Sequence, residues 1–322
     1  MEIKSKMSQA TQKLKLRDHS TTIVRRIVQI TAFFLINYII LEVLFTINLL
    51  AIEGMIKVLP VLNSPRNPLS RGGGILEYIF FSLAEGTFPI LLIAILLLII
   101  LFTNRFFCGW ICPIGTIQDG CAAIPVKNKK TVKKETHEKM IKIKYVPVII
   151  LLLLLVPLAI AKFTDINFYL DFKAGLGALA QKPFGYFSLS EYIFVFFPEV
   201  INEIIVSATL MPLFSNFFRL IIFIFYIIVI IGSIWYPRVY CRYLCPYGAV
   251  ASAISPYSFL KLSRSPVKCV GRAECGICER VCPKQVRILD EPFEFFTGHG
   301  ECNFCLKCQE SCPYKAIDIK FG

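Results

Sequence analysis

The chain of 322 residues is poor in charge and has almost no histidine. Only 18% of its residues are charged, compared with about a quarter in ordinary soluble domains, whereas 56% are hydrophobic. Its three histidines, His19, His137 and His299, lie outside the long apolar runs, which excludes a haem held between paired histidines within a membrane. The sequence contains no P-loop, dinucleotide-binding fingerprint or hydrolytic triad. The chain therefore has no evident means of oxidising a soluble hydride donor by itself.

The apolar residues gather in four runs long enough to cross a bilayer, which takes about 20 residues. Of the 35 Lys and Arg, 28 lie in the N-terminal tail, around the segment between the second and third runs, and after the fourth run. Basic segments stay on the cytoplasmic side, so we predict a multi-pass protein of the cytoplasmic membrane with both termini inside. The net charge of +13 is then a topology signal, and we expect no nucleic-acid binding. The predicted spans are Ile27–Ala51, Phe88–Phe107, Tyr145–Ala161 and Leu220–Tyr236.

These runs predict a mainly α fold, a four-span transmembrane helical bundle with a small C-terminal α+β domain. Residues 1–22 form a basic cytoplasmic tail, residues 23–260 the transmembrane domain, and residues 261–322 a ferredoxin-like domain. We expect the first apolar run to remain as an anchor, because it is longer than the apolar part of a signal peptide. The outer loops are 53–86 and 162–219. In the second of these we favour interfacial or re-entrant helices over two extra spans.

Eight of the thirteen cysteines form two blocks near the C-terminus. The second block has the spacing C-x2-C-x2-C-x3-C-P of bacterial ferredoxins, in which the fourth thiolate ligates the other cluster. The first block has five residues between its first two cysteines, and this insertion can loop out. We therefore predict two [4Fe–4S] clusters in the cytoplasm, the first held by Cys269, Cys275, Cys278 and Cys312, the second by Cys282, Cys302, Cys305 and Cys308.

Zinc and disulfides are the two alternatives for these eight cysteines. Zinc would be satisfied by two C-x2-C pairs per ion and does not need the third cysteine that precedes proline in each block. Disulfides require an oxidising compartment, whereas the charge pattern places the domain in the cytoplasm. The segments Val286–Leu289 and Ala316–Ile319 are predicted to be the small strands of the ferredoxin domain.

Four further cysteines repeat a second motif, C-x3-C-P-x-G, at the ends of the second and fourth runs. Residues four apart share one face of a helix, so each motif presents two thiols in one direction. Together the four sulfurs, of Cys108, Cys112, Cys241 and Cys245, could bind a third metal or iron–sulfur centre or act as redox-active thiols. The alternative is that small cysteines pack tightly against neighbours. Cys121 belongs to no motif and is interpreted as an ordinary thiol.

Glu42 lies within the first predicted span, with Asn37 and Asn48 on roughly the same side. A carboxylate inside a membrane is costly and therefore suggests function, here as a proton acceptor for a quinol. A protonated or hydrogen-bonded packing role is the alternative. Glu77 and Glu85, near the outer interface, are weaker candidates for the same proton transfer.

The two C-x3-C-P-x-G motifs, the first of them reading C-G-W-I-C-P-I-G, together with the C-terminal ferredoxin blocks, resemble the NapH/NosR/CcoG group of membrane polyferredoxins. The resemblance covers roughly residues 80–320 and is greatest to the NapH-like form. It implies that the membrane part oxidises quinol or performs another membrane electron step, and that the clusters pass electrons onward. The flavin domain of NosR-like members and the additional C-terminal domain of CcoG-like members are not recognised in this sequence.

We therefore interpret the chain as an electron carrier between the quinone pool, or a membrane partner, and a redox partner protein. In this role it would be a component of a quinol dehydrogenase. A second hypothesis is an assembly or maturation factor that reduces a metal ion or a disulfide for a respiratory complex. A third is a non-enzymatic electron-transfer subunit of a larger complex.

Overall fold

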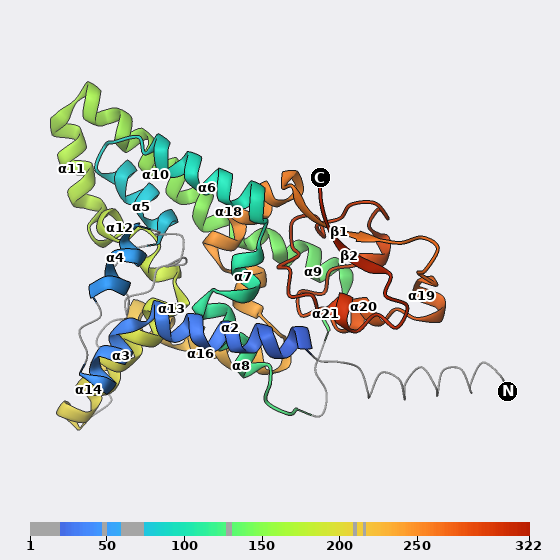
Figure 1. The fold of residues 1–322 in the computed structure, drawn as a ribbon. Coiled ribbons are helices and arrows are strands. Elements are labelled where there is room, and N and C mark those ends of the chain that lie inside the picture. Colours follow the sequence, from blue (N-terminus) through green and yellow to red (C-terminus); the bar gives the residue numbers. More distant parts are fainter. Residues whose placement is uncertain (1–19, 47–49, 59–73, 127–130, 209–210, 215–216) are drawn as a thin grey trace. The chain divides into compact units, whose positions relative to one another are not determined.

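The computed structural model describes residues 20–46, 50–58, 74–126, 131–208, 211–214 and 217–322 (Figure 1). These residues are mostly helical, with one two-stranded sheet. They form two compact units. The smaller unit comprises the described residues of 1–30, 99–110 and 251–322, and the larger unit those of 31–98 and 111–250.

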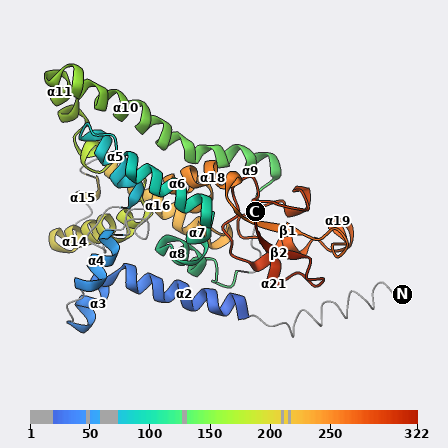
Figure 2. The same ribbon diagram turned by 45° about the horizontal axis from the view of Figure 1, so that its top comes forward.

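The larger unit is built from helices that differ greatly in length. Figures 1 and 2 show α10 as a long helix that continues through a sharp turn into α11. Helix α10 also packs against α5, and α16 packs against α8 and α17. The helices lying wholly in this unit are α3 (Tyr38–Phe45), α4 (Leu50–Val58), α5 (Ile75–Ala84), α8 (Pro113–Cys121), α9 (Lys134–Ile141), α10 (Tyr145–Thr164), α11 (Ile166–Leu176), α12 (Ala178–Gln181), α13 (Leu189–Glu191), α14 (Phe197–Ser207), α15 (Met211–Phe214), α16 (Phe217–Trp235) and α17 (Val239–Tyr243), with 3-10 turns Lys142–Lys144 and Gly185–Phe187 and a π-helix, η5, at Tyr192–Phe196.

Two of the described helices are long and apolar enough to cross a membrane. One is the continuous helix Lys134–Thr164, which contains the predicted span Tyr145–Ala161, and the other is α16, which coincides closely with Leu220–Tyr236. Their apolar side chains are largely uncovered: Phe217, Phe218 and Ile228 are 72%, 73% and 63% exposed. Exposed apolar surface of this extent is typical of contact with lipid.

The first predicted span is not the straight helix expected from Ile27–Ala51. Helix α2 (Ser20–Ile36) and α3 are bent by 73°, and together they count as a third candidate span only if the bent pair is one crossing. The break is at Asn37, whose side-chain Nδ2 donates to the carbonyl of Phe33 at 2.7 Å. An asparagine amide that bonds to nearby backbone competes with the helix, which explains the interruption.

The second predicted span, Phe88–Phe107, contains a helix of only 14 residues, α6 (Ile90–Thr103). Helix α6 ends because the backbone of Asn104 is left-handed, with φ of 55°. A residue in this conformation cannot continue a right-handed helix. The preceding segment, α5, is a separate helix with seven buried residues.

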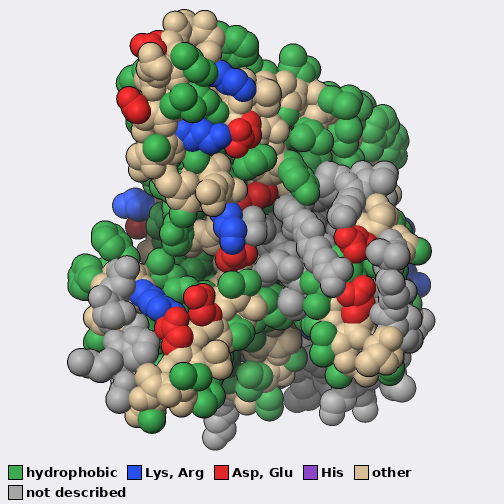
Figure 3. Space-filling model, turned by 90° about the vertical axis from the view of Figure 1, so that its left-hand side faces the viewer, with side chains coloured by type: hydrophobic (Ala, Val, Ile, Leu, Met, Phe, Trp, Pro, Cys, Tyr) green, Lys and Arg blue, Asp and Glu red, His purple; other side chains and the backbone are tan. Residues whose placement is uncertain are grey.

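The segment 162–219 contains several helices, and none in its described part is both long and apolar enough to count as a membrane span. Charged side chains here pair with one another. Lys173 and Glu85 are 2.7 Å apart, and Arg219 and Glu203 are 2.8 Å apart. Figure 3, which views the molecule from the left-hand side of Figure 1, shows basic side chains beside acidic ones among apolar side chains.

The smaller unit contains the antiparallel pair β1 (Leu260–Arg264) and β2 (Ile317–Phe321), seen side by side in Figures 1 and 2. Its helices are α7 (Phe106–Trp110), α19 (Gly271–Glu274), α20 (Ile277–Arg280) and α21 (Lys307–Glu310), with 3-10 turns Ser255–Tyr257 and Ile288–Asp290; α2, α6 and α18 (Pro246–Ile254) have residues in both units.

The predicted strand at Ala316–Ile319 is confirmed, starting one residue later, but the predicted strand at Val286–Leu289 is wrong. That segment runs into a 3-10 turn, and Val286 and Ile288 pack into the core beside Phe296. The partner of β2 is instead β1, which pairs Leu262 with Ile319. Leu262 also bridges to Phe296 on its other edge, so β1 is held from both sides.

Candidate iron–sulfur centres

The eight cysteines of the C-terminal blocks line two separate cavities in the smaller unit. Each cavity takes three cysteines from one block and the fourth from the other block. The structure thereby brings together both sets expected from the crossed-ligand rule of two-cluster ferredoxins. The first cavity is lined by Cys269, Cys275, Cys278 and Cys312, and the second by Cys282, Cys302, Cys305 and Cys308.

The two blocks repeat the same backbone path. The residue after the second cysteine is left-handed in both, with φ of 60° at Gly276 and 57° at Leu306. The third residue after the fourth cysteine is left-handed as well, with φ of 54° at Gln285 and 47° at Lys315. Such values are uncommon for residues other than glycine, so this repeat is a feature of the fold that residue types did not reveal. The extra residues of the first block form the short helix α19, away from the repeat.

Backbone amides point at the fourth sulfur of each block. Val286 N–H donates to Cys282 Sγ at 3.4 Å, and Ala316 N–H donates to Cys312 Sγ at 3.3 Å. The remaining lining is largely apolar, with Leu262 and Phe296 beside the second cavity. Hydrogen bonds to sulfur and a dry surrounding are two of the factors that set the reduction potential of an iron–sulfur cluster.

Burial changes the acidity of these thiols. Desolvation raises the pKa of Cys278 to about 11, and it raises the pKa values of Cys302 and Cys308 well above the ordinary value. Thiols in such surroundings stay protonated unless positive charge is supplied next to them. Iron supplies that charge and removes the protons, so this donor set suits a metal cluster.

The arrangement of the thiols favours a cluster over a single ion. In the segments that the structure describes, no three Cys, His, Asp or Glu side chains are close enough to hold one metal ion. All thirteen cysteines fall in these segments, and none of them forms a disulfide there. Each cavity is lined by four thiols, which is the number of cysteine ligands that a [4Fe–4S] cluster takes.

Three buried charged side chains lie beside the second cavity. Arg105 NH1 contacts Glu301 Oε2 at 3.2 Å and donates to the carbonyl of Gly300 at 2.7 Å, and Lys284 Nζ lies 3.3 Å from the same Glu301 oxygen. All three side chains are less than 10% exposed. One carboxylate thus contacts two cations, and the charge of Arg105 opposes the stronger effect of desolvation on the pKa of the Cys302 thiol.

The segment Cys108-Gly109-Trp110 contacts the loop of the second cavity. Trp110 Nε1 donates to the carbonyl of Phe304 at 2.8 Å. A Cβ added at Gly109 would lie 2.0 Å from the carbonyl oxygen of Asn303, so only glycine permits this approach. Gln29, from α2, donates to the Gly109 carbonyl at 3.0 Å. The first C-x3-C-P motif therefore begins directly against the loop between Cys302 and Cys305.

The second C-x3-C-P motif is held by two side chains of α8, the helix that follows the first motif. Gln118 Oε1 accepts from the Tyr240 amide at 3.1 Å, and its Nε2 donates to Cys241 Sγ at 3.0 Å. Asp119 forms a bidentate pair with Arg238, with both N–O distances 2.7 Å. These residues were missed from sequence, because nothing in the spacing indicated that α8 would meet the start of α17.

The four cysteines of these motifs are divided between the units: Cys108 lies in the smaller unit and the other three in the larger. Cys112 and Cys245 are buried, and Gly248 N–H donates to Cys245 Sγ at 3.3 Å. This contact resembles the amide–sulfur contacts of Cys282 and Cys312, which also precede proline. Cys121, at the end of α8, is half-buried.

Comparison with known proteins places both motifs in a recognised family. A model described as "4Fe-4S binding domain" matches residues 85–131 and 217–261, each of which contains one C-x3-C-P motif. The chain is similar to the electron transport protein YccM of Escherichia coli, with 26% identity over 72% of this chain and 57% of YccM. It is also similar to the regulatory protein NosR of Pseudomonas aeruginosa, with 26% identity over 67% of this chain and 25% of NosR. The chain belongs to the NapH/NosR-type electron-transport proteins.

A ferredoxin of Methanothermococcus thermolithotrophicus is 34% identical over 53 residues, 16% of this chain and 87% of the ferredoxin. No solved structure matches the chain. The chain thus spans about half of YccM and a quarter of NosR, and it shares with NapH/NosR-type proteins an iron–sulfur electron-transport character.

The acidic residues considered for proton transfer in this NapH/NosR-type protein have different surroundings. Glu42 lies half-buried in α3, five residues after the bend at Asn37, whereas Asn48 lies outside the described residues. Glu77 is buried and accepts from the Phe184 amide at 3.2 Å, and Glu85 pairs with Lys173. The last two therefore serve to join α5 to the segment 162–219.

Proposed function

We propose that this protein relays single electrons between the membrane quinone pool, or a membrane partner, and a redox partner protein. The observation that carries the proposal is the pair of cavities, each lined by the crossed set of four cysteines. Two clusters a short distance apart in one small domain form a path for one-electron steps. The two or three apolar helices of spanning length support a path that begins at a membrane.

The clusters would supply the one-electron chemistry, and the chain's own residues would set its conditions. The cysteine thiolates would hold the iron, while Leu262, Ile288 and Phe296 keep water from the second cavity. Amide donors to Cys282 and Cys312 and the positive charge of Arg105 favour the reduced, more negative state of a cluster. These groups would keep the potential high enough for a membrane donor to reduce the clusters.

We infer a four-span topology with both termini and the clusters in the cytoplasm. Helix α10, α16 and the bent pair α2–α3 supply three crossings, and α6 supplies the fourth when the apolar residues around it are included. The distribution of basic residues supports the orientation. Fusing a reporter that is active only outside the cytoplasm to residue 322 tests it, and a strong signal from that fusion contradicts the orientation.

We also propose that Cys108, Cys112, Cys241 and Cys245 bind a third iron–sulfur centre. The match of the 4Fe-4S domain model to the two segments that contain them supports this, as does the amide–sulfur contact at Cys245. Iron and acid-labile sulfide analysis of anaerobically purified protein distinguishes the cases. About eight iron atoms per chain indicate two clusters only, and about twelve indicate three.

The relay is tested with the purified protein under anaerobic conditions. A quinol analogue should bleach the visible absorption of the clusters and produce the EPR signal of reduced [4Fe–4S] centres. Cys121→Ser is the matched control, because Cys121 lines neither cavity. Clusters that dithionite reduces but quinol does not would overturn the relay. Reduction of Cu(II) or of a disulfide by the same protein would then indicate the maturation role.

A further inference from the structure

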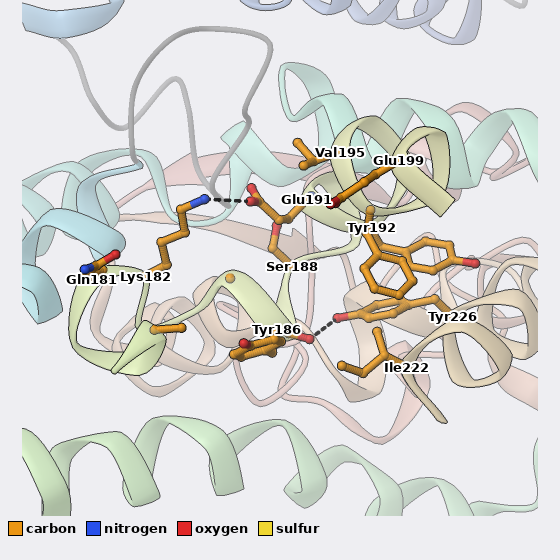
Figure 4. Close-up of a pocket in the computed structure, with 13 residues that line it drawn as sticks. Gln181, Lys182, Tyr186, Ser188, Glu191, Tyr192, Val195, Glu199, Ile222 and Tyr226 are labelled. Atoms are coloured by element: carbon orange, nitrogen blue, oxygen red, sulfur yellow. Dashed lines mark hydrogen bonds and ion pairs between the residues drawn. The ribbon is translucent and has the colours of Figure 1, made fainter. Parts of the chain in front are cut away.

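The larger unit contains a cavity of about 330 Å³ that the iron–sulfur chemistry does not use (Figure 4). Its walls come from α12, the turn Gly185–Phe187, α13, the π-helix η5 and α16. Ligand sites in proteins range from about 300 to 1,000 Å³, so this cavity suits one substituted ring better than a nucleotide.

The backbone on one side of the cavity is unusual. Residues Tyr192–Phe196 form a π-helix, and Tyr192, Val195 and Phe196 of this turn line the cavity. Pro198 follows closely and has no N–H to donate to the carbonyl four residues before it, which favours the wider turn. Such turns are rare and often occur at functional sites.

Aromatic side chains supply a flat wall. The rings of Tyr192 and Tyr226 stack with centroids 4.8 Å apart and planes 23° from parallel. Their hydroxyls are used elsewhere: Tyr226 donates to the Tyr186 carbonyl at 2.8 Å, and Tyr192 donates to the Phe223 carbonyl at 3.2 Å. The bonded hydroxyls hold the rings in place, so the wall is preformed and can receive a planar ring.

A carboxylate lies in the same cavity. Glu191 Oε1 is 3.4 Å from Lys182 Nζ, and its side chain is only 14% exposed whereas that of Lys182 is 51% exposed. Figure 4 shows this pair together with Glu199, which also lines the cavity. The cavity therefore combines an aromatic wall with two carboxylate side chains, Glu191 and Glu199.

We propose that this cavity binds the headgroup of a membrane quinol and that Glu191 accepts a proton from it. The proposal rests on the proposed function, because one-electron acceptors of this kind need a donor that releases electrons singly. A quinol breaks two O–H bonds and loses two protons and two electrons. Glu191 takes one proton and Glu199 the other, for release to water, and one electron goes to each of two oxidised [4Fe–4S] clusters. The exposed apolar side chains of Tyr186 and Val195, which line the cavity, suit a ligand that arrives through lipid.

Binding is measured directly, with decyl-ubiquinone and a menaquinone analogue as probes of full-length protein in detergent, by isothermal titration calorimetry. Ile222→Trp places a bulky ring in the cavity, and we expect it to weaken quinone binding at least tenfold while the cluster spectrum stays the same. Ile221→Trp is the matched control, because Ile221 is 46% exposed on the same helix and does not line the cavity. It should bind as the wild type does.

Glu191→Gln separates binding from proton transfer. We expect quinone binding to stay within about threefold of wild type, while the rate of cluster reduction by quinol falls at least tenfold. Equal binding by wild type and Ile222→Trp overturns the cavity assignment and leaves the relay in place. Absence of both quinone binding and cluster reduction in the wild type overturns the proposed function itself.

Discussion

The ion pair of Asp119 and Arg238 should be the most sensitive point in the larger unit. Both side chains are at most 5% exposed, and the two N–O distances of 2.7 Å make the pair bidentate. Replacing Asp119 by Asn keeps the shape but leaves a buried guanidinium without its counter-charge. Breaking a buried pair in this way costs about 3–5 kcal/mol.

The assay is thermal unfolding in detergent, followed by circular dichroism. For a protein of this size roughly 2–4 °C is lost per kcal/mol, so we expect Asp119→Asn to lower Tm by about 6–20 °C. Glu138→Gln is the control, because Glu138 pairs with Lys134 at 3.9 Å with both side chains more than half exposed. Loss of that pair should cost less than about 1 kcal/mol.

A double variant tests the coupling. Asp119→Leu combined with Arg238→Met removes both charges, so its loss of stability should be smaller than the sum of the two single losses. Equal Tm values for Asp119→Asn and Glu138→Gln would refute the reasoning. The pair anchors the start of α17, so the destabilised single variants should also lose any iron bound near Cys241.

The remaining predictions concern the smaller unit. Gly109→Ala should lower the free energy of unfolding, measured by chemical denaturation, by about 1–3 kcal/mol, because the new methyl group would overlap the Asn303 carbonyl. An unchanged free energy of unfolding would contradict the close approach. Arg105→Met should lower the reduction potential of one cluster by on the order of tens of mV in EPR-monitored titration, since a buried positive charge is lost, and an upward shift would contradict this. Cys312→Ser should abolish the EPR signal of the cluster whose other three ligands come from the first block, whereas Cys121→Ser should leave both signals intact; loss of the second-block cluster instead would overturn the crossed assignment.

The two sets of cysteines that line the cavities could be predicted, because the cysteine spacings of a ferredoxin motif are short and regular. Cysteines separated by two residues can reach the same iron–sulfur cube, whereas the fourth cysteine, before proline, reaches the other cube. Helices α10 and α16 could also be predicted, because their long apolar runs by themselves indicate membrane-spanning helices. The cysteine spacing could not predict which polar side chains contact the motifs. Gln118 and Arg105 act on partners more than a hundred residues away.

Two expectations from the sequence, a straight first span and a strand at Val286–Leu289, differ from the structure for a similar physical reason. Hydropathy averaged over Ile27–Ala51 is high, and it is insensitive to one amide at Asn37 that bends the helix. Likewise, Val286–Leu289 has the composition of a strand, but Ile288 is needed in the core, and β1 takes the place beside β2. In both cases a single side-chain or pairing choice outweighed the local preference.

By itself the sequence determined the iron–sulfur character of this protein, the cysteine blocks and the apolar helices, because each depends on residues close together in the chain. Only the tertiary structure decided which charges lie beside the second cavity, why Gly109 must be glycine and where a ring-binding cavity forms. Those features arise where distant segments pack, and their energies depend on burial and distance that residue order does not record.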